Sequence, residues 1–365
     1  MGARFREMCV IAGLSAGVLL KCDGKHHIEA SRQNFFAENT LYKLRKQFHM
    51  FDWHVAFQLE LLLHNGLLTT TELNDILPSI KRLCQQYPDN NSLVAGRLLR
   101  KYSEALPDRP PTESPQACFK RITELKARPG DMHLAAGNFE CCHVTFTPTR
   151  LILEGPYAIQ SNRVIRRYRG YEEHFIRVDF RDEDRLSFRW NRDVDGSSFL
   201  KERVGGKLKQ GFLLAGRAFE FLAYSNSALR EHSVWFMRPF RHPTGLVTAE
   251  FIRQSLGNFQ GTQLLKCPSK YAARLAQAFT ATDPSVSIRR DEWELVEDLT
   301  SEPIRRLGRE DVSVFTDGVG TISEALALKI WDALCEQHPR SGPNDIQPSA
   351  VSTLLSTGTS DTRLF

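Results

Sequence analysis

Residues 141–153, CCHVTFTPTRLIL, decide the fold class, because apolar and polar side chains alternate on both sides of a Thr-Pro-Thr turn. Val144 and Phe146 precede the turn, and Leu151 and Leu153 follow it. The same period of two recurs in three later groups, which are Ile176, Val178 and Phe180; Leu186, Phe188 and Trp190; and Phe219, Phe221 and Ala223. Such alternation predicts a series of half-buried strands from about residue 141 to 236, with turns at Gly155-Pro156, Asp195-Gly196 and Gly205-Gly206.

The flanking segments have a helical period instead. Residues from about 34 to 105 are expected to be helical, because Phe51, Val55 and Leu59 recur at a spacing of four, and Asn65-Gly66 is a plausible helix stop. Thr71 is a candidate N-cap for the next helix.

Two more helices are expected after the strands. Ser269 is a candidate N-cap before Tyr271, Leu275 and Phe279, and Thr321 forms a capping-box pattern with Glu324. Residues 337–365 are rich in Ser, Thr, Pro and Gly without periodicity, which predicts a disordered or aberrant tail.

The chain of 365 residues has room for two or three domains. We expect an α+β protein with a helical region at 1–106, a proline-rich linker at 107–116, a β-rich region at 117–336 and the tail at 337–365. With 41% hydrophobic and 25% charged residues, the composition excludes collagen-like and disordered classes. The apolar run 9–20 is too short to span a membrane, which requires about 20 residues.

The eight cysteines have no regular spacing, which indicates reduced thiols in an intracellular protein, nuclear or cytoplasmic. A secretory signal at residues 4–20 is the alternative, and a buried strand or helix is favoured there.

The formal net charge of +5 permits a phosphate-bearing partner without requiring one. The densest basic cluster contains Arg163, Arg166 and Arg167, followed by Arg177, and Tyr168, Tyr171 and Phe175 are interleaved with it. Arginines bind phosphates and aromatic rings stack on bases, so the segment could line a nucleic-acid groove, although a solvated turn is the plainer interpretation. Lys270, Arg274 and Gln277 share one face of the helix expected after Ser269 and form a second candidate.

Other motifs favour structural interpretations. Asp193 and Asp195 could hold Mg²⁺, but Asp195-Gly196 between strand patterns is first a hairpin turn. Cys141, Cys142 and His143 lack the spacing of a zinc site, since adjacent residues of a strand point to opposite faces. Gly205-Gly206-Lys207 and Gly318-Val319-Gly320 are incomplete phosphate-binding and dinucleotide-binding motifs and are expected to be turns. No catalytic or metal-binding residue is therefore assigned.

Taken in succession, segments between 144 and 323 resemble the cellular RNA-dependent RNA polymerases of eukaryotic RNA silencing, in their fungal form. The blocks that carry the resemblance are 144–151 VTFTPTRL, 155–156 GP, 161–164 SNRV, 175–178 FIRV, 182–184 DED, 216–222 GRAFEFL, 225–231 SNSALRE, 235–236 WF, 270–275 KYAARL, 315–320 FTDGVG and 322–323 IS. Phe57-Gln58-Leu59-Glu60 and Asn65-Gly66 resemble the helical region upstream of these blocks.

The resemblance implies a slab-like region and the start of a double-psi β-barrel polymerase core. It also implies a single-stranded RNA template, nucleoside triphosphates, Mg²⁺, production of small interfering RNA in RNA interference, and silencing-machinery proteins as possible partners. The family's Asp-x-Asp-Gly-Asp motif is absent from this chain. Because nucleotidyl transfer requires carboxylates that position two Mg²⁺ ions, we expect the isolated chain to bind no catalytic metal and to be inactive.

We therefore expect a fragmentary or degenerate member of this nucleotidyltransferase family. The alternatives are a non-catalytic RNA-binding or interaction protein derived from it, and an unrelated α+β protein in which the same blocks serve packing and turns only.

Overall fold

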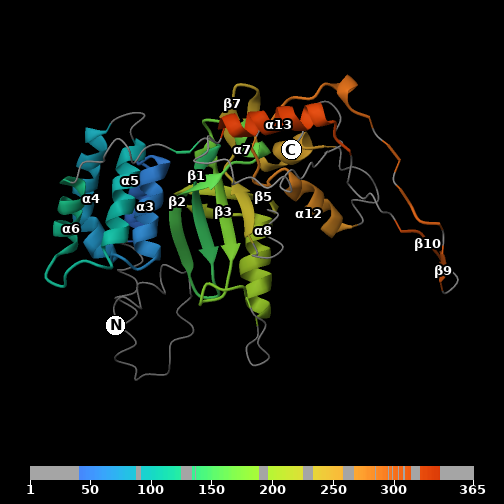
Figure 1. Ribbon diagram of the computed structural model, residues 1–365. Helices are drawn as coiled ribbons and strands as arrows, with labels where there is room; N and C mark the ends of the chain where they lie inside the picture. Colours follow the sequence, from blue (N-terminus) through green and yellow to red (C-terminus); the bar gives the residue numbers. More distant parts are fainter. Residues whose placement is uncertain are drawn as a thin grey trace.

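The computed structural model describes residues 41–87, 92–124, 134–135, 137–188, 196–224, 233–257, 267–283, 285–294, 296–297, 299–302, 304–306, 309–313 and 321–337. Helices come first, and a six-stranded sheet and shorter helices follow (Figure 1). The predicted α+β class, with a helical N-terminal region and a β-rich central region, is confirmed. No helix within the described ranges is long and apolar enough to cross a membrane.

The helical region is a bundle around α3 (Trp53–His64), which is buried along nearly its whole length. The predicted stop is correct, because Asn65 caps α3 and Gly66 has a φ of 67°. The predicted N-cap at Thr71 is wrong by two residues. Thr69 caps α4 (Thr70–Gln86), since its hydroxyl accepts a hydrogen bond from the Glu72 amide and the Glu72 carboxylate accepts one from the Thr69 amide.

The proline-rich segment 107–114 joins α5 (Ser92–Ala105) to α6 (Pro115–Glu124). The two helices share one core, because the Tyr102 hydroxyl donates to the Pro115 carbonyl and the Tyr102 ring packs edge-on against Phe119. The change from helix to strand comes after α6, and the expected division into domains stays a prediction.

The central sheet has the strand order β2-β1-β3-β6-β5-β4. Its strands are β1 (Asn138–Phe146), β2 (Leu151–Gln160), β3 (Phe175–Phe180), β4 (Phe212–Leu214), β5 (Arg217–Tyr224) and β6 (Ser233–Met237). β1 and β3 are parallel, and the other neighbouring pairs are antiparallel. Four of the five predicted strand groups are thus correct, whereas Leu186 and Phe188 lie outside the named strands and Trp190 lies outside the described residues.

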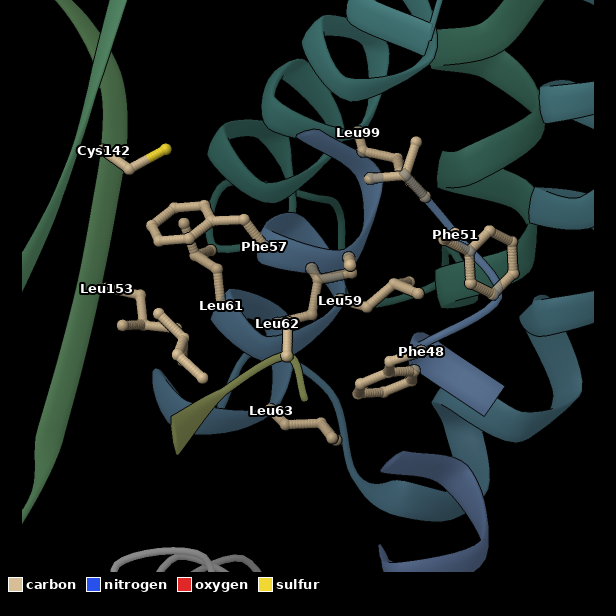
Figure 2. Packing of buried hydrophobic residues seen from close by; sticks show 14 of the residues in the cluster. Phe48, Phe51, Phe57, Leu59, Leu61, Leu62, Leu63, Leu99, Cys142 and Leu153 are labelled. Carbon is tan, nitrogen blue, oxygen red and sulfur yellow. The ribbon is translucent and has the colours of Figure 1, made fainter. Parts of the chain in front are cut away.

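The two faces of the sheet bury two different clusters. Val144, Leu153 and Val178 pack with the bundle, where Figure 2 shows Leu153 and Cys142 close to Phe57 and Leu61. Phe139 and Trp235 belong to the second cluster, which short helices cover. Cys141 lies in the second cluster and Cys142 in the first, so the adjacent thiols point to opposite faces as predicted.

Two polar side chains of the bundle bind the backbone of the edge strand β2. The Asn65 amide donates to the Leu153 carbonyl (2.7 Å) and accepts from the Leu153 amide (3.0 Å), and Gln58 donates to the Gly155 carbonyl (2.9 Å). This arrangement protects the edge, because strand edges otherwise present unpaired backbone groups.

Several predicted boundaries are wrong. Gly155-Pro156 lies inside β2, opposite a register shift in β1, with Gly155 at a φ of 93°. Gly205-Gly206 is no turn, since it joins the π-helix η5 (Phe199–Gly205) to α8 (Gly206–Gln210). Cys267, not Ser269, is the N-cap of α12 (Pro268–Gln277). The Ser323 hydroxyl, not that of Thr321, accepts a hydrogen bond at the start of α13 (Glu324–Gln337).

The remaining elements are short. They are α7 (Arg163–Arg167), η4 (Glu172–His174), β7 (Phe240–His242), β8 (Gly245–Val247), α10 (Ala249–Ser255), η6 (Arg290–Glu292), β9 (Ile304–Arg306) and β10 (Arg309–Asp311). The apolar run 9–20, Asp193 and Asp195, the segment 315–320 and the tail 338–365 lie outside the described residues.

Candidate nucleic-acid interface

The predicted basic residues are carried mainly by the helices that cover the second face of the sheet. Val164 and Ile165 of α7, Ile252 of α10, and Leu275 of α12 all belong to the second cluster. Figure 1 shows α12 on the opposite side of the sheet from the bundle of α3 to α6. We call α7, α10 and α12 the helical layer.

α7 is a single turn whose apolar residues face the sheet. The Asn162 side chain caps it by accepting a hydrogen bond from the Ile165 amide (3.0 Å). Because Val164 and Ile165 are buried, the flanking arginines lie toward the outside, with Arg163 half-buried and Arg167 exposed. The local fold therefore separates an apolar side from a basic one.

Arg167 is exposed at the surface of the helical layer. Its guanidinium lies 3.2 Å from the Ser255 hydroxyl of α10 and 5.9 Å from the centre of the Tyr168 ring. These contacts hold the exposed charge close to the surface of the helical layer.

Arg166, by contrast, has internal partners. Its guanidinium donates to the Thr282 carbonyl and to the Thr282 hydroxyl, which joins α7 to the segment that follows α12. Burial lowers the pKa of Arg166, and the nearby Asp283 carboxylate partly offsets this effect. Arg166 therefore positions α7 with respect to the end of α12.

Arg177 also lies inside the fold. It projects from β3 and donates from two nitrogens to the Ser233 hydroxyl of β6 (3.0 and 2.9 Å), with the Asp179 carboxylate 3.7 Å away. Asp179 and Ser233 are buried. The structure thus separates Arg177 from the exposed arginines of α7 and places it in a polar network between strands.

α12 has the two faces that its sequence predicts. Leu275 is buried, as is Phe279 just beyond the helix, whereas Arg274 and Gln277 are exposed. Lys270 belongs to the same helix, one turn before Arg274, and its side chain is outside the described part of the chain. The helix therefore presents at least one basic side chain to solvent.

The aromatic rings that were expected to stack on nucleic-acid bases are not exposed. Tyr168 and Phe175 are 3% and 1% exposed, so their rings belong to the core. Tyr171 is half-buried and stacks on Phe240 of β7, with ring centres 4.8 Å apart. Sequence reasoning missed this contact, because the hairpin of β7 and β8 supplies the partner from more than sixty residues away.

Among the residues that the structure describes, none form a candidate site for a catalytic magnesium ion. The described part contains no group of three His, Cys, Asp or Glu side chains that could hold a metal ion. The Asp-x-Asp-Gly-Asp motif is missing from the sequence. The adjacent cysteines do not suit zinc, since burial raises the pKa of Cys141 to about 12 and that of Cys142 well above its usual value. We derive no metal-dependent step from these residues.

The fold is that of an α+β protein whose helical layer exposes the basic side chains of Arg167 and Arg274. The family model described as RNA dependent RNA polymerase matches residues 146–353. This match covers more than half of the chain, and the chain therefore belongs to the RNA-dependent RNA polymerase family.

Named relatives agree with this assignment. RNA-dependent RNA polymerase 1 of Arabidopsis thaliana is 37% identical over 193 residues, covering 51% of this chain and 16% of the relative. The probable polymerase SHL2 of Oryza sativa subsp. japonica is 27% identical over 299 residues, covering 77% of this chain and 22% of the relative. RNA-dependent RNA polymerase 1 of Schizosaccharomyces pombe is 28% identical over 229 residues, covering 62% of this chain and 17% of the relative.

A solved structure is also similar. The RNA dependent RNA polymerase QDE-1 from Thielavia terrestris has a TM-score of 0.44 and 14% identity, covering 79% of this chain and 30% of that chain. The chain spans between 16% and 24% of the length of the relatives that it matches in sequence.

Proposed function

We propose that this chain is an RNA-binding part of an RNA-directed RNA polymerase of the silencing type, and that it guides single-stranded template. Family membership and the exposed basic side chains of the helical layer support the proposal. Its place in the fold would be the slab-like region and the start of the polymerase core. Small interfering RNA production, nucleoside triphosphate use and contacts with silencing proteins would belong to the complete polymerase.

We infer that the chain alone does not catalyse nucleotidyl transfer. The support is chemical, because the reaction requires carboxylates that hold two metal ions and the family's carboxylate motif is absent. A non-catalytic RNA-binding protein derived from the family is the second candidate. The absence of the carboxylate motif also favours this second candidate. Both candidate functions include RNA binding.

The observation that carries RNA binding is the arrangement of Arg167 and Arg274, which are both exposed on the helical layer. Arg163 and Lys270 would extend this surface. Arg166 and Arg177 would act indirectly, because both have partners inside the protein. Contacts to phosphate position a nucleic acid without specifying its sequence, so the expected binding is tolerant of sequence.

Salt dependence tests this assignment. Each phosphate neutralised on a single strand contributes about 0.7 to the slope of log affinity against log salt. Replacing Arg167 and Arg274 by Ala should therefore reduce the slope of single-stranded RNA binding by up to about 1.4. Fluorescence anisotropy of the purified chain between low and moderate salt measures the slope.

The matched control removes two exposed charges from the bundle, Arg82 and Lys120, whose side chains lie on α4 and α6. This control should keep the wild-type slope. Equal slopes for both double variants would place the RNA elsewhere, and no RNA binding by the wild-type chain would overturn the proposed function.

A further inference from the structure

Phe251 of α10 is an aromatic residue that the fold leaves at the surface. It is 41% exposed, whereas Ala249 and Ile252 of the same helix are buried in the second cluster. A phenyl ring in water forgoes the stabilisation that burial of its large apolar area would supply. Because single exposed apolar residues are common on proteins, the surroundings of the ring decide whether it has a role.

The helix that carries this ring is fixed firmly on the sheet. The Glu220 carboxylate of β5 accepts a hydrogen bond from the Ala249 amide at the start of α10 (2.7 Å). Arg253 donates to the Phe221 carbonyl of the same strand (2.8 Å). The backbone position of Phe251 is therefore set before any ligand binds, which reduces the entropy that binding costs.

The exposed ring lies beside an exposed cation. Phe251 and Ser255 are four residues apart on α10, so they share one side of the helix with their Cβ atoms about 5–6 Å apart. The Ser255 hydroxyl accepts a hydrogen bond from the Arg167 guanidinium of α7 (3.2 Å). The place where α7 meets α10 thus presents an apolar ring and a guanidinium next to each other.

The acidic neighbour of the ring does not cancel this cation. At 3.6 residues per turn, Ser255 lies about 40° from Phe251 around α10, and Glu250 lies about 100° away in the opposite direction. The Glu250 carboxylate accepts two hydrogen bonds from Arg253 (2.9 and 3.2 Å). Its charge is therefore offset within α10, on the side of the helix away from Arg167.

We propose that Phe251 stacks on an unpaired base of a single-stranded RNA whose phosphate is bound by Arg167. The inference rests on the proposed function and deepens it, because it adds a contact to the bases. Every base has a flat π face, so this contact is tolerant of sequence, as are contacts to phosphate. Phe251 supplies the stacking surface that Tyr168 and Phe175, both buried, do not.

The test measures binding of the full chain to a single-stranded RNA of about 15 nucleotides, because one protein module covers up to about 16. Phe251→Ala should weaken binding at least about fivefold, the lower end of the range for a base stacked on an aromatic ring. The slope of log affinity against log salt should not change, because a neutral ring releases no counterions. Arg167→Ala, by contrast, should lower this slope by about 0.7.

The matched control is Tyr42→Ala in the helical region before α3. Tyr42 is 59% exposed, and the Lys46 ammonium lies 4.7 Å from the centre of its ring. This variant also removes an exposed ring beside a cation, but far along the chain from the helical layer. Its RNA affinity should stay within about twofold of wild type.

Two further variants separate stacking from general apolar contact. Phe251→Leu keeps an apolar side chain with good helix propensity, so its melting temperature should stay close to that of wild type, but it should bind RNA as weakly as Phe251→Ala. Phe251→Trp restores a ring and should bind at least as tightly as wild type. An RNA backbone of the same length without bases should bind equally to wild type and to Phe251→Ala.

Several results would overturn the stacking role while RNA binding at Arg167 and Arg274 stands. They are an affinity of Phe251→Ala no lower than that of Tyr42→Ala, wild-type binding by Phe251→Leu, or an equal loss on the RNA without bases. Unchanged RNA affinity with reduced self-association of Phe251→Ala would identify a second copy of the chain as the occupant instead. If the wild-type chain binds no RNA, the proposed function falls together with this inference.

Discussion

Arg166 and Arg167 are adjacent in the sequence but have different environments. Arg166 is turned toward Thr282 and is half-buried, whereas Arg167 is exposed. Only the tertiary fold separates them, because the partner of Arg166 lies more than a hundred residues away. A cluster of basic residues in the sequence predicts a basic surface. It does not predict which of their side chains form hydrogen bonds inside the protein and which face solvent.

His143 gives a prediction on pH. Burial, followed by the charge of Arg177, lowers its pKa to about 4 from an unfolded value of 6.5. Between these values the unfolded chain binds more protons than the folded one, so stability falls as the pH decreases from 6.5 to 4. Across this pH range, His143 should lower the free energy of unfolding by at most about 3 kcal/mol. Urea unfolding at a series of pH values measures it.

The control for this prediction is His143→Phe, which keeps a ring beside Tyr157, whose own ring centre lies 5.4 Å away. This variant should show a weaker pH dependence between 4 and 6.5. Part of the pH dependence should remain, because burial and then the charge of Arg238 also lower the pKa of His174 to about 4. An identical pH profile for wild type and variant would show that His143 is not protonated on unfolding.

At the scale of elements, the junction between α3 and β2 depends on Asn65. Asn65→Ala removes two hydrogen bonds and leaves the Leu153 amide and carbonyl without that partner, which should destabilise the protein by about 2 to 3 kcal/mol. Hydrogen exchange at the Leu153 amide should become faster. Asn74→Ala, on the exposed side of α4, is the matched control and should change neither quantity. Unchanged exchange at Leu153 in Asn65→Ala would contradict the proposed role.

The helices and strands also show which structural features can be predicted from the sequence. Alternation at Val144, Leu153 and Val178 predicts strands correctly, because burial on one face imposes a period of two. Glycines were less informative. Gly66 ends a helix as expected, but Gly155 lies within a strand and Gly206 within a helix, since the same residue permits all three conformations.

The candidate site was predictable only in part. The exposed face of α12 follows from local periodicity, and the structure confirms it at Arg274 and Gln277. The burial of Tyr168 under Phe240 depends on a hairpin distant in sequence, and local patterns carry no signal for it.

For the molecule as a whole, we expect RNA binding without synthesis. The purified chain should incorporate no labelled nucleotide on a primed RNA template with Mg²⁺ or Mn²⁺, because the Asp-x-Asp-Gly-Asp motif, whose carboxylates would position the metal ions, does not occur in the sequence. Incorporation that depends on the template, and that disappears in Asp193→Ala with Asp195→Ala, would show that this pair supplies the missing carboxylates.

We expect this chain to bind RNA on the helical layer that covers the second face of the sheet. Hydrogen exchange with and without single-stranded RNA tests it most directly, because bound segments exchange more slowly. The expected result is slower exchange in Arg163–Arg167 and Pro268–Gln277, with no change in α4 and α6. Slower exchange confined to the bundle, or no change anywhere at saturating RNA, would contradict the claim.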